Sequence, residues 1–152
     1  MSPTRLGYDE LIAELRALVA DEPDLVANLA NITAAVRDAL PIASWVGFYV
    51  RRGEDLVLGP FQGKVACVRI ALGRGVCGTA AAERRTIVVP DVNAFPGHIA
   101  CDAGSKSEIV VPVIRDGVVA VLDLDSYELA AFDDVDAEGL GRVAELAATL
   151  AW

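Results

Sequence analysis

Two apolar segments of the chain, residues 108–115 and 118–126, are separated only by Asp116 and Gly117. An Asp-Gly pair between two such segments is a strong signal for a two-residue turn, so the pattern predicts a β-hairpin. The two strands of a hairpin are antiparallel neighbours, whereas a doubly wound parallel sheet needs a helical crossover between most of its strands. The sequence therefore predicts a largely antiparallel sheet.

The remaining elements follow from the spacing of apolar residues. Residues 8–20 and about 23–40 have helical spacing, with Pro23 in the first turn of the second helix and Pro41 at its end. Further strands are expected at residues 44–50, 56–60, 67–71 and 86–89, and further helices at residues 76–84 and 134–150.

This order, ααβββαβββα, predicts an α/β domain of the α+β type with about six strands flanked by helices. It is expected to be one domain over residues 1–152. The N-terminal helices would occupy about 6–40, the sheet and its loops about 44–126, and the last helix about 134–150.

Composition excludes several classes of function. Hydrophobic residues make up 54% of the chain, which is enough for a single core, and 13 Lys and Arg against 22 Asp and Glu give a net charge of −9. A chain without a basic face is not expected to bind nucleic acid. Its longest apolar stretches fall far below the ~18 residues of a membrane-spanning helix, and its first residues lack the apolar core of a signal peptide. A cytoplasmic protein whose three cysteines begin as thiols is expected.

A glycine-rich segment, GRGVCG at residues 73–78, matches the G-x-G-x-x-G pattern of dinucleotide-binding turns. It lies in the middle of the chain, within a hairpin-rich sheet, and no acidic residue ends a strand about 20 positions further on. A tight turn from a strand into a helix is the better interpretation.

The three cysteines, Cys67, Cys77 and Cys101, lack the close pairs that structural zinc sites usually carry, although His98 leaves a Cys₃His site open. Cys67 alternates with its neighbours along a predicted strand and fits a buried, inert role. Cys101 does not, because it lies in the long polar loop of residues 90–106, where exposure and His98 would favour a reactive thiolate. Thiol redox chemistry is one hypothesis for this loop.

Five further residues are candidates for a pocket. Asp123 and Asp125 lie two apart on a predicted strand and share a face, either towards solvent or continuing the apolar face of Val119 and Val121. In the second case burial would raise their pKa values and make them proton donors. Glu108 opens the neighbouring strand and could reach the same place. Trp45 and Tyr49 also share a face and would be core residues or the apolar wall of a pocket.

Seven short segments occur in a characteristic order along nearly the whole chain. They are ANLAN at 27–31, WVGFY at 45–49, LGPFQG at 58–63, GRGVCG at 73–78, GHIACD at 97–102, SEIVVP at 107–112 and LDLDS at 122–126. With these segments the chain closely resembles the free methionine-(R)-sulfoxide reductases, enzymes built on a GAF domain. All three cysteines occupy family positions. Asn93 stands where the family pattern has histidine, a departure that is not expected to touch the chemistry.

The resemblance implies reduction of free L-methionine-(R)-sulfoxide to methionine. Cys101 would attack the sulfoxide sulfur and become a sulfenic acid, which Cys67 would convert to a disulfide, with Cys77 as an alternative partner or relay. Thioredoxin would then reduce the disulfide. The acids that would supply or stabilise the proton are Glu108, Asp123 and Asp125, and the residues that would hold the S-methyl group are Trp45 and Tyr49. No metal or bound organic cofactor is expected, and the family implies a homodimer.

Two other functions are open. A ligand-sensing GAF module would bind a small molecule without chemistry, but it would not need Cys101 matched by Cys67, and 152 residues leave no room for an output domain. A stand-alone thiol redox sensor would use the same cysteines without turnover. For the enzyme, the loop of residues 90–106 is expected to cover a small pocket and to restrict the substrate to the free amino acid.

Overall fold

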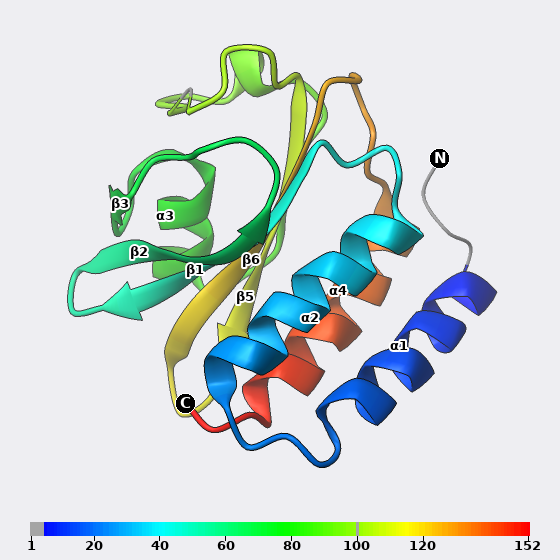
Figure 1. Cartoon of the computed structure of the whole chain (residues 1–152). Coiled ribbons are helices and arrows are strands. Elements are labelled where there is room, and N and C mark those ends of the chain that lie inside the picture. Colours follow the sequence, from blue (N-terminus) through cyan, green and yellow to red (C-terminus); the bar gives the residue numbers. More distant parts are fainter. Residues whose placement is uncertain (1–4, 100) are drawn as a thin grey trace.

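In a computed structural model, which describes residues 5–99 and 101–152, six strands form one sheet in the order β3-β2-β1-β6-β5-β4 (Figure 1). All five neighbouring pairs are antiparallel. The strands are β1 Trp45–Arg52, β2 Asp55–Gln62, β3 Arg69–Ala71, β4 Ile87–Val89, β5 Ser107–Ile114 and β6 Val118–Ser126. The helices are α1 Arg5–Val19, α2 Leu25–Ala39, α3 Gly75–Glu83 and α4 Asp134–Ala148, with a 3₁₀ turn, η1, at Val92–Ala94.

The predicted α+β class, the largely antiparallel sheet and the order of elements are confirmed. The hairpin of β5 and β6 turns at Asp116 and Gly117, which have φ values of 57° and 147°. These left-handed conformations are the ones that an Asp-Gly turn favours. Asp24 caps α2, because its side chain accepts a hydrogen bond from the backbone N–H of Ala27 at 2.8 Å.

One strand is shorter than expected. β3 begins at Arg69 and not at Cys67, so Cys67 lies in the loop before the strand and is only partly buried. The interpretation of Cys67 as a buried, inert strand residue is therefore wrong.

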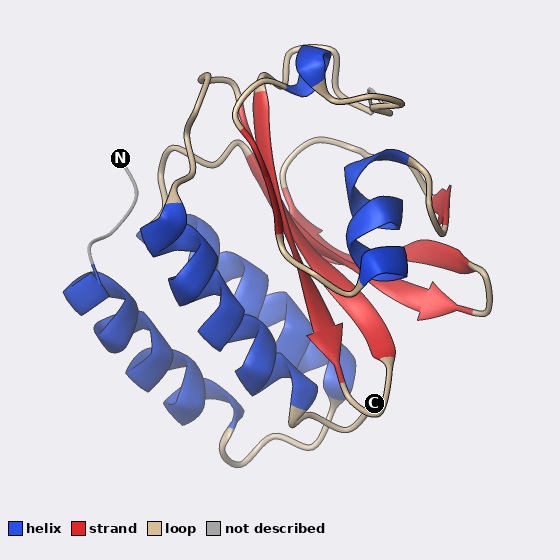
Figure 2. Cartoon of the chain, turned by 180° about the vertical axis from the view of Figure 1, so that it is seen from behind, coloured by secondary structure: helices blue, strands red, loops and turns tan. Residues whose placement is uncertain are grey.

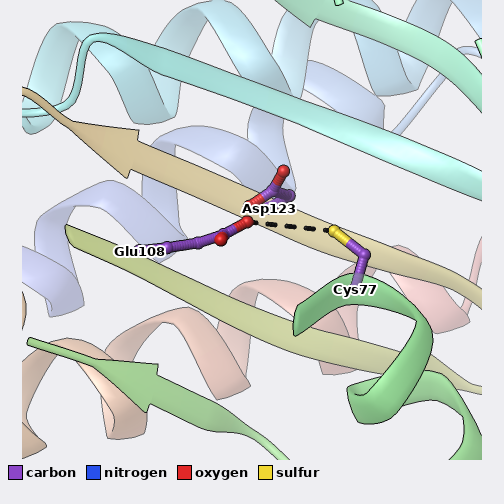
Figure 3. A group of neighbouring side chains, drawn as sticks. All are labelled: Cys77, Glu108 and Asp123. Atoms are coloured by element: carbon purple, nitrogen blue, oxygen red, sulfur yellow. Dashed lines mark hydrogen bonds between the residues drawn. The ribbon is translucent and has the colours of Figure 1, made fainter. Parts of the chain in front are cut away.

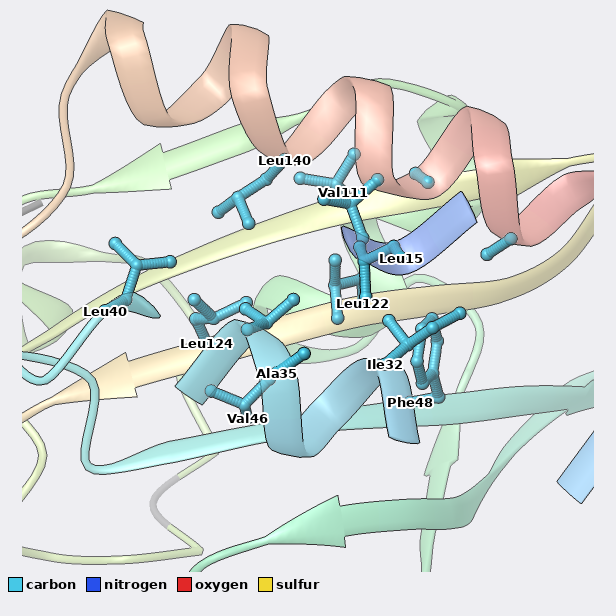
Figure 4. Packing of buried hydrophobic residues seen from close by; sticks show 14 of the residues in the cluster. Leu15, Ile32, Ala35, Leu40, Val46, Phe48, Val111, Leu122, Leu124 and Leu140 are labelled. Carbon is cyan, nitrogen blue, oxygen red and sulfur yellow. The ribbon is translucent and has the colours of Figure 1, made fainter. Parts of the chain in front are cut away.

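The helices cover the two faces of the sheet unequally. α2 and α4 pack on one face, α1 packs on the outer side of these two helices, and α3 lies on the opposite face (Figures 1 and 2). The larger core fills the space between the three helices and the sheet, and Figure 4 shows its central residues. Fully buried side chains from both layers include Leu15, Ile32, Phe48, Leu122 and Leu140.

A smaller apolar cluster lies between α3 and the opposite face of the sheet. Its members include Val76 and Ala80 from α3 and Val110 and Val121 from the central strands. Because α3 is short, it covers only part of this face, and the polar ends of β5 and β6 lie beside it. No helix in the described part of the chain is long and apolar enough to cross a membrane.

Candidate active site

Side chains from neighbouring strands form two rows on the face that α3 covers. In the first row, Trp45 of β1 lies opposite Asp125 of β6, which lies opposite Glu108 of β5. In the second, Gly47 lies opposite Asp123. Directly opposed residues in a sheet share a face, so the three carboxyl groups and the indole meet at one place.

Gly47 makes room for the indole. A Cβ atom at this position would lie 2.4 Å from the ring of Trp45. The ring stacks on Phe61 and on Tyr49, with centroid distances of 5.3 Å and 5.9 Å. Phe61 was not among the residues predicted for the site, although it belongs to the LGPFQG segment.

The carboxyl groups line a cavity of about 50 Å³ between the sheet, the first turn of α3 and two loops. The first loop, residues 63–68, precedes β3, and the second, residues 90–106, precedes β5. The side chains that line the cavity include seven of the eight acidic, aromatic and thiol candidates, Trp45, Tyr49, Cys77, Cys101, Glu108, Asp123 and Asp125, and the loop residues Lys64, Ala66, His98, Ile99 and Asp102. The eighth, Cys67, is not among the lining residues but is joined to Cys101 by a disulfide. The structure thus brings the predicted site residues together. The alternative in which Asp123 and Asp125 face solvent is wrong, because Asp123 is buried and Asp125 is partly buried beside it.

Burial controls the protonation of this cluster. It raises the pKa of Glu108 well above its ordinary value, and the charge of Asp125 raises it further. The pKa values of Asp123 and Asp125 are also raised, mainly by burial and next by the charge of a neighbouring carboxyl group. Oδ1 of Asp123 is buried without a hydrogen-bond partner in the described part of the chain. The cavity therefore holds acids that retain protons above the usual carboxyl range.

Cys77 lies beneath these acids, at the start of α3 (Figure 3). Its Sγ is 4.0 Å from Oε2 of Glu108, a weak thiol hydrogen bond. Burial, and next the charge of Asp123, raises the pKa of the thiol. Cys77, Glu108 and Asp123 have ligand atoms within 4.8 Å of one another, so they are the group in the described residues that could hold a metal ion. The three cysteines and His98 do not form a Cys₃His site in this structure, because a disulfide joins Cys67 to Cys101.

A disulfide between Cys67 and Cys101 joins the two loops at the mouth of the cavity, with 5.5 Å between the Cα atoms. The first loop is held by the aromatic residues beneath it. Nε1 of Trp45 donates a hydrogen bond to the carbonyl of Lys64 at 3.0 Å, and the hydroxyl of Tyr49 donates one to the carbonyl of Cys67 at 2.9 Å. Trp45 and Tyr49 thus position Cys67 as well as line the cavity.

The second loop has a neighbour on each side of Cys101. Nε2 of His98 lies 3.7 Å from Oε1 of Glu108, and the hydroxyl of Tyr127 donates a hydrogen bond to Oδ2 of Asp102 at 2.6 Å. Burial lowers the pKa of His98 and favours the neutral imidazole. The contact that the structure shows for His98 is with Glu108, and not the thiolate-stabilising contact expected with Cys101.

The glycine-rich segment makes the expected tight turn into α3. The N–H of Gly73 donates a hydrogen bond to the carbonyl of Gly78 at 2.8 Å. A Cβ atom on Gly78 would lie 2.4 Å from the carbonyl oxygen of Ala71. The glycines therefore allow close approach of the backbone and place Cys77 at the cavity.

Comparison with known proteins matches residues 20–150 to the GAF domain family. The chain is 49% identical over 146 residues to a free methionine-R-sulfoxide reductase of Escherichia coli, covering 95% of this chain and 88% of that protein. It superposes on a free methionine-R-sulfoxide reductase of Neisseria meningitidis, solved in complex with its substrate, with a TM-score of 0.93 and 48% identity, covering 97% of this chain and 90% of that one. The chain belongs to the free methionine-R-sulfoxide reductase family.

Membership in the free methionine-R-sulfoxide reductase family also confirms the GAF fold that the sequence segments implied. A structure described as a putative GAF sensor protein from Burkholderia vietnamiensis is similar as well, with a TM-score of 0.94 and 53% identity over 99% of this chain and 97% of that one. The names of the relatives thus include both an enzyme and a sensor.

Proposed function

We propose that this protein reduces free L-methionine-(R)-sulfoxide to L-methionine with Cys101 as the nucleophile. The observation that carries the proposal is the Cys67–Cys101 disulfide, which lies directly over a cavity lined by Glu108, Asp123 and Asp125. A thiol pair beside buried carboxylic acids is the combination that sulfoxide reduction requires. A module that only binds a ligand has no use for it.

The first step is attack by the Cys101 thiolate on the sulfoxide sulfur. The thiolate supplies the electron pair and the sulfoxide oxygen accepts a proton. The S–O bond of the substrate breaks, its oxygen ends as the hydroxyl group of a sulfenic acid on Cys101, and the sulfur leaves in reduced form as methionine. In the second step the Cys67 thiol attacks the sulfenic sulfur, the S–S bond forms, and water leaves. The structure corresponds to the oxidised state at the end of this sequence.

The proton in the first step comes from the carboxyl cluster. Glu108 and Asp125 lie opposite each other on β5 and β6, and burial raises the pKa of both. A carboxylic acid that remains protonated near neutral pH is an efficient proton donor. Asp123 lies on the same face of the sheet. After burial, its charge is the next largest cause of the raised pKa of Asp125.

The aromatic pair supports binding of the substrate. Trp45 and Tyr49 are buried, stack on each other and line the cavity, so they offer an apolar wall to the S-methyl group. Ile99, Cys101 and Asp102 of the loop over the cavity complete the lining. A covered pocket favours the free amino acid, because a peptide would extend beyond it and leave buried polar groups unpaired.

Reduction of the Cys67–Cys101 disulfide back to two thiols requires an external dithiol, and thioredoxin is the proposed reductant. Cys67 is the proposed resolving cysteine because it is already paired with Cys101. Cys77 is the free cysteine of the described residues and is buried against Glu108, so a role as alternative partner or relay requires movement of α3 or of the loops. This cycle uses only side chains of the chain and the reductant. By family resemblance we also propose a cytoplasmic homodimer.

The test is methionine release from each epimer of the sulfoxide, free and as the N-acetyl amide, with dithiothreitol as reductant. The proposed function predicts turnover of the free R epimer and little of the S epimer or of the blocked R compound. A thiol redox switch, which the disulfide would also suit, predicts oxidation and reduction of the protein without catalytic methionine release. Comparable kcat/KM for the free and blocked R compounds would contradict the proposed specificity.

A further inference from the structure

Exposed apolar side chains gather around the disulfide. Val65 and Val68 flank Cys67, and their side chains are 89% and 63% exposed. Ile99, two residues before Cys101, is 38% exposed. Isolated apolar residues are common on protein surfaces, but a group that surrounds a reactive bond marks an interaction site.

The fold holds this surface in place. The loop of Val65 and Val68 is tied to the sheet through its backbone, since Trp45 and Tyr49 donate hydrogen bonds to the carbonyls of Lys64 and Cys67. The N–H of Leu58 donates another to the carbonyl of Val68 at 2.9 Å. A surface that is already ordered loses little conformational entropy when a partner binds.

The charges beside the disulfide differ from those of the whole chain. The net charge is −9, yet Lys64 and Arg74 line the cavity mouth, and Lys64 is one of only two lysines in the sequence. Among the residues that the structure describes, neither forms a salt bridge, and Lys64 lies 5.6 Å from the centre of the Tyr127 ring. Asp102 lines the same cavity; it is hydrogen-bonded to Tyr127, and the charge of Lys64 is one of the causes that lower its pKa. The other acids of the cavity are Glu108, Asp123 and Asp125, and burial raises their pKa values and favours their uncharged forms. The mouth therefore complements a partner with an acidic surface.

We propose that Val65, Val68 and Ile99, with Lys64 and Arg74 at their border, form the docking surface for a protein dithiol of the thioredoxin class. The partner would carry its reactive cysteine in an apolar surface with acidic residues around it. This inference rests on the proposed function, because it concerns the reductant of the same disulfide. A small thiol such as glutathione would gain little from such a surface.

The exchange has two steps. A thiolate of the partner attacks one sulfur of the Cys67–Cys101 bond, forming a mixed disulfide, and the other cysteine leaves as a thiolate that takes up a proton. The second thiol of the partner then attacks the sulfur of the partner's first cysteine in the mixed disulfide and releases the remaining cysteine of this protein. Two electrons pass to this protein, and the partner ends as a disulfide.

The experiment measures reduction of the oxidised protein without any sulfoxide, using thioredoxin with its reductase and NADPH in one arm and dithiothreitol in the other. The Val65→Ser/Val68→Ser double variant is compared with Val26→Ser. Val26 on α2 is 63% exposed, the same as Val68, and is a matched control.

The proposal predicts that the second-order rate constant with thioredoxin falls at least about tenfold in the double variant, while the rate with dithiothreitol changes less than about twofold. Val26→Ser should match the wild type in both arms. In Lys64→Gln the thioredoxin rate should fall and become less sensitive to salt.

An unchanged thioredoxin rate in the double variant, or an equal fall in both arms, would overturn the docking surface. Because no sulfoxide is present, these results are independent of the proposed enzymatic function. That function fails separately, if the wild-type protein releases no methionine with dithiothreitol.

Discussion

Nε2 of His98 lies 3.7 Å from Oε1 of Glu108, so the loop that carries Cys101 comes close to the carboxyl cluster on the sheet. Asp102, on the other side of Cys101, accepts a 2.6 Å hydrogen bond from the hydroxyl of Tyr127. The proposed nucleophile therefore lies between a residue that approaches the acids and a residue that is hydrogen-bonded to Tyr127.

Substitution of the two disulfide cysteines should separate the steps of the cycle. Cys101→Ser should release no methionine even in a single turnover, because a neutral hydroxyl is a poor nucleophile towards sulfur. Cys67→Ser should release about one equivalent and then lose turnover with thioredoxin. Rapid-quench measurement of methionine checks both. A stoichiometric burst from Cys101→Ser would contradict the assignment of the nucleophile.

Removal of an acid should slow the reductive step. Glu108→Gln and Asp125→Asn are each expected to lower the burst rate of methionine formation at least about a hundredfold, since a positioned proton donor contributes roughly 10²–10⁴-fold. Asp123→Asn should have a smaller effect. Asp116→Asn is the control, because Asp116 lies in the hairpin turn at φ 57°, which asparagine also adopts. Near-wild-type bursts from folded Glu108 and Asp125 variants would leave the proton source unidentified.

Tyr49→Phe should affect the second step more than the first. The change removes the hydrogen bond to the carbonyl of Cys67, which loosens the loop and costs about 1–3 kcal/mol of stability if the carbonyl stays unsatisfied. Closure of the disulfide should slow while the methionine burst remains, as followed by mass spectrometry of quenched samples. Tyr127→Phe, which removes a more exposed hydroxyl, is the comparison. Equal closure rates in wild type and Tyr49→Phe would show that this bond does not position Cys67.

The raised pKa of Asp123 predicts how stability depends on pH. The folded protein keeps a proton that the unfolded chain loses above about pH 4. This contribution is complete below the unfolded pKa and is lost as the pH rises through the folded pKa. The free energy of unfolding should therefore fall as the pH rises above about 4, and less so in Asp123→Asn.

Urea unfolding over this pH range measures the slope, and Asp102→Asn is the control. The pKa of Asp102 is lowered, first by its hydrogen bond with Tyr127, so its contribution is lost only as the pH falls below the usual carboxyl range. Its substitution should leave the slope above about pH 5 unchanged. Identical slopes for wild type and Asp123→Asn would contradict a retained proton on Asp123.

Cys77 should be the slowest thiol to react. It is 4% exposed, and burial raises its pKa, so little thiolate is available near neutral pH. In the oxidised protein, iodoacetamide should modify Cys77 only after unfolding, whereas Cys67 and Cys101 should react readily once reduced. Peptide mapping with time identifies the modified residue. Rapid modification of Cys77 in the folded, oxidised protein would contradict its burial.

Most of the fold could be predicted because its signals are local. The turn at Asp116 and Gly117, the break between the first two helices and the alternation along β6 all lie within a few residues of the elements that they define. The candidate site followed from the same alternation, because Asp123 and Asp125 must share a face. Even Glu108 could be added, since the hairpin places it opposite Asp125.

The features that could not be predicted depend on contacts between segments that are distant in the sequence. Whether the aspartates meet solvent or a cavity is decided by α3, which covers their face of the sheet. The late start of β3 at Arg69 accompanies hydrogen bonds that Trp45 and Tyr49 donate to the preceding loop, 19 and 18 residues away in the sequence. The contact of His98 with Glu108 joins a loop to a strand. None of these has a periodic signal in the sequence.

The small volume of the cavity has a kinetic consequence. In the disulfide state it is about 50 Å³, room for a few water molecules but well below the roughly 300–1,000 Å³ of typical small-molecule sites. An enzyme with the proposed cycle would then bind sulfoxide only after the bridge between Cys67 and Cys101 has opened. Its two half-reactions would alternate, in a ping-pong scheme where excess sulfoxide does not obstruct the oxidised form.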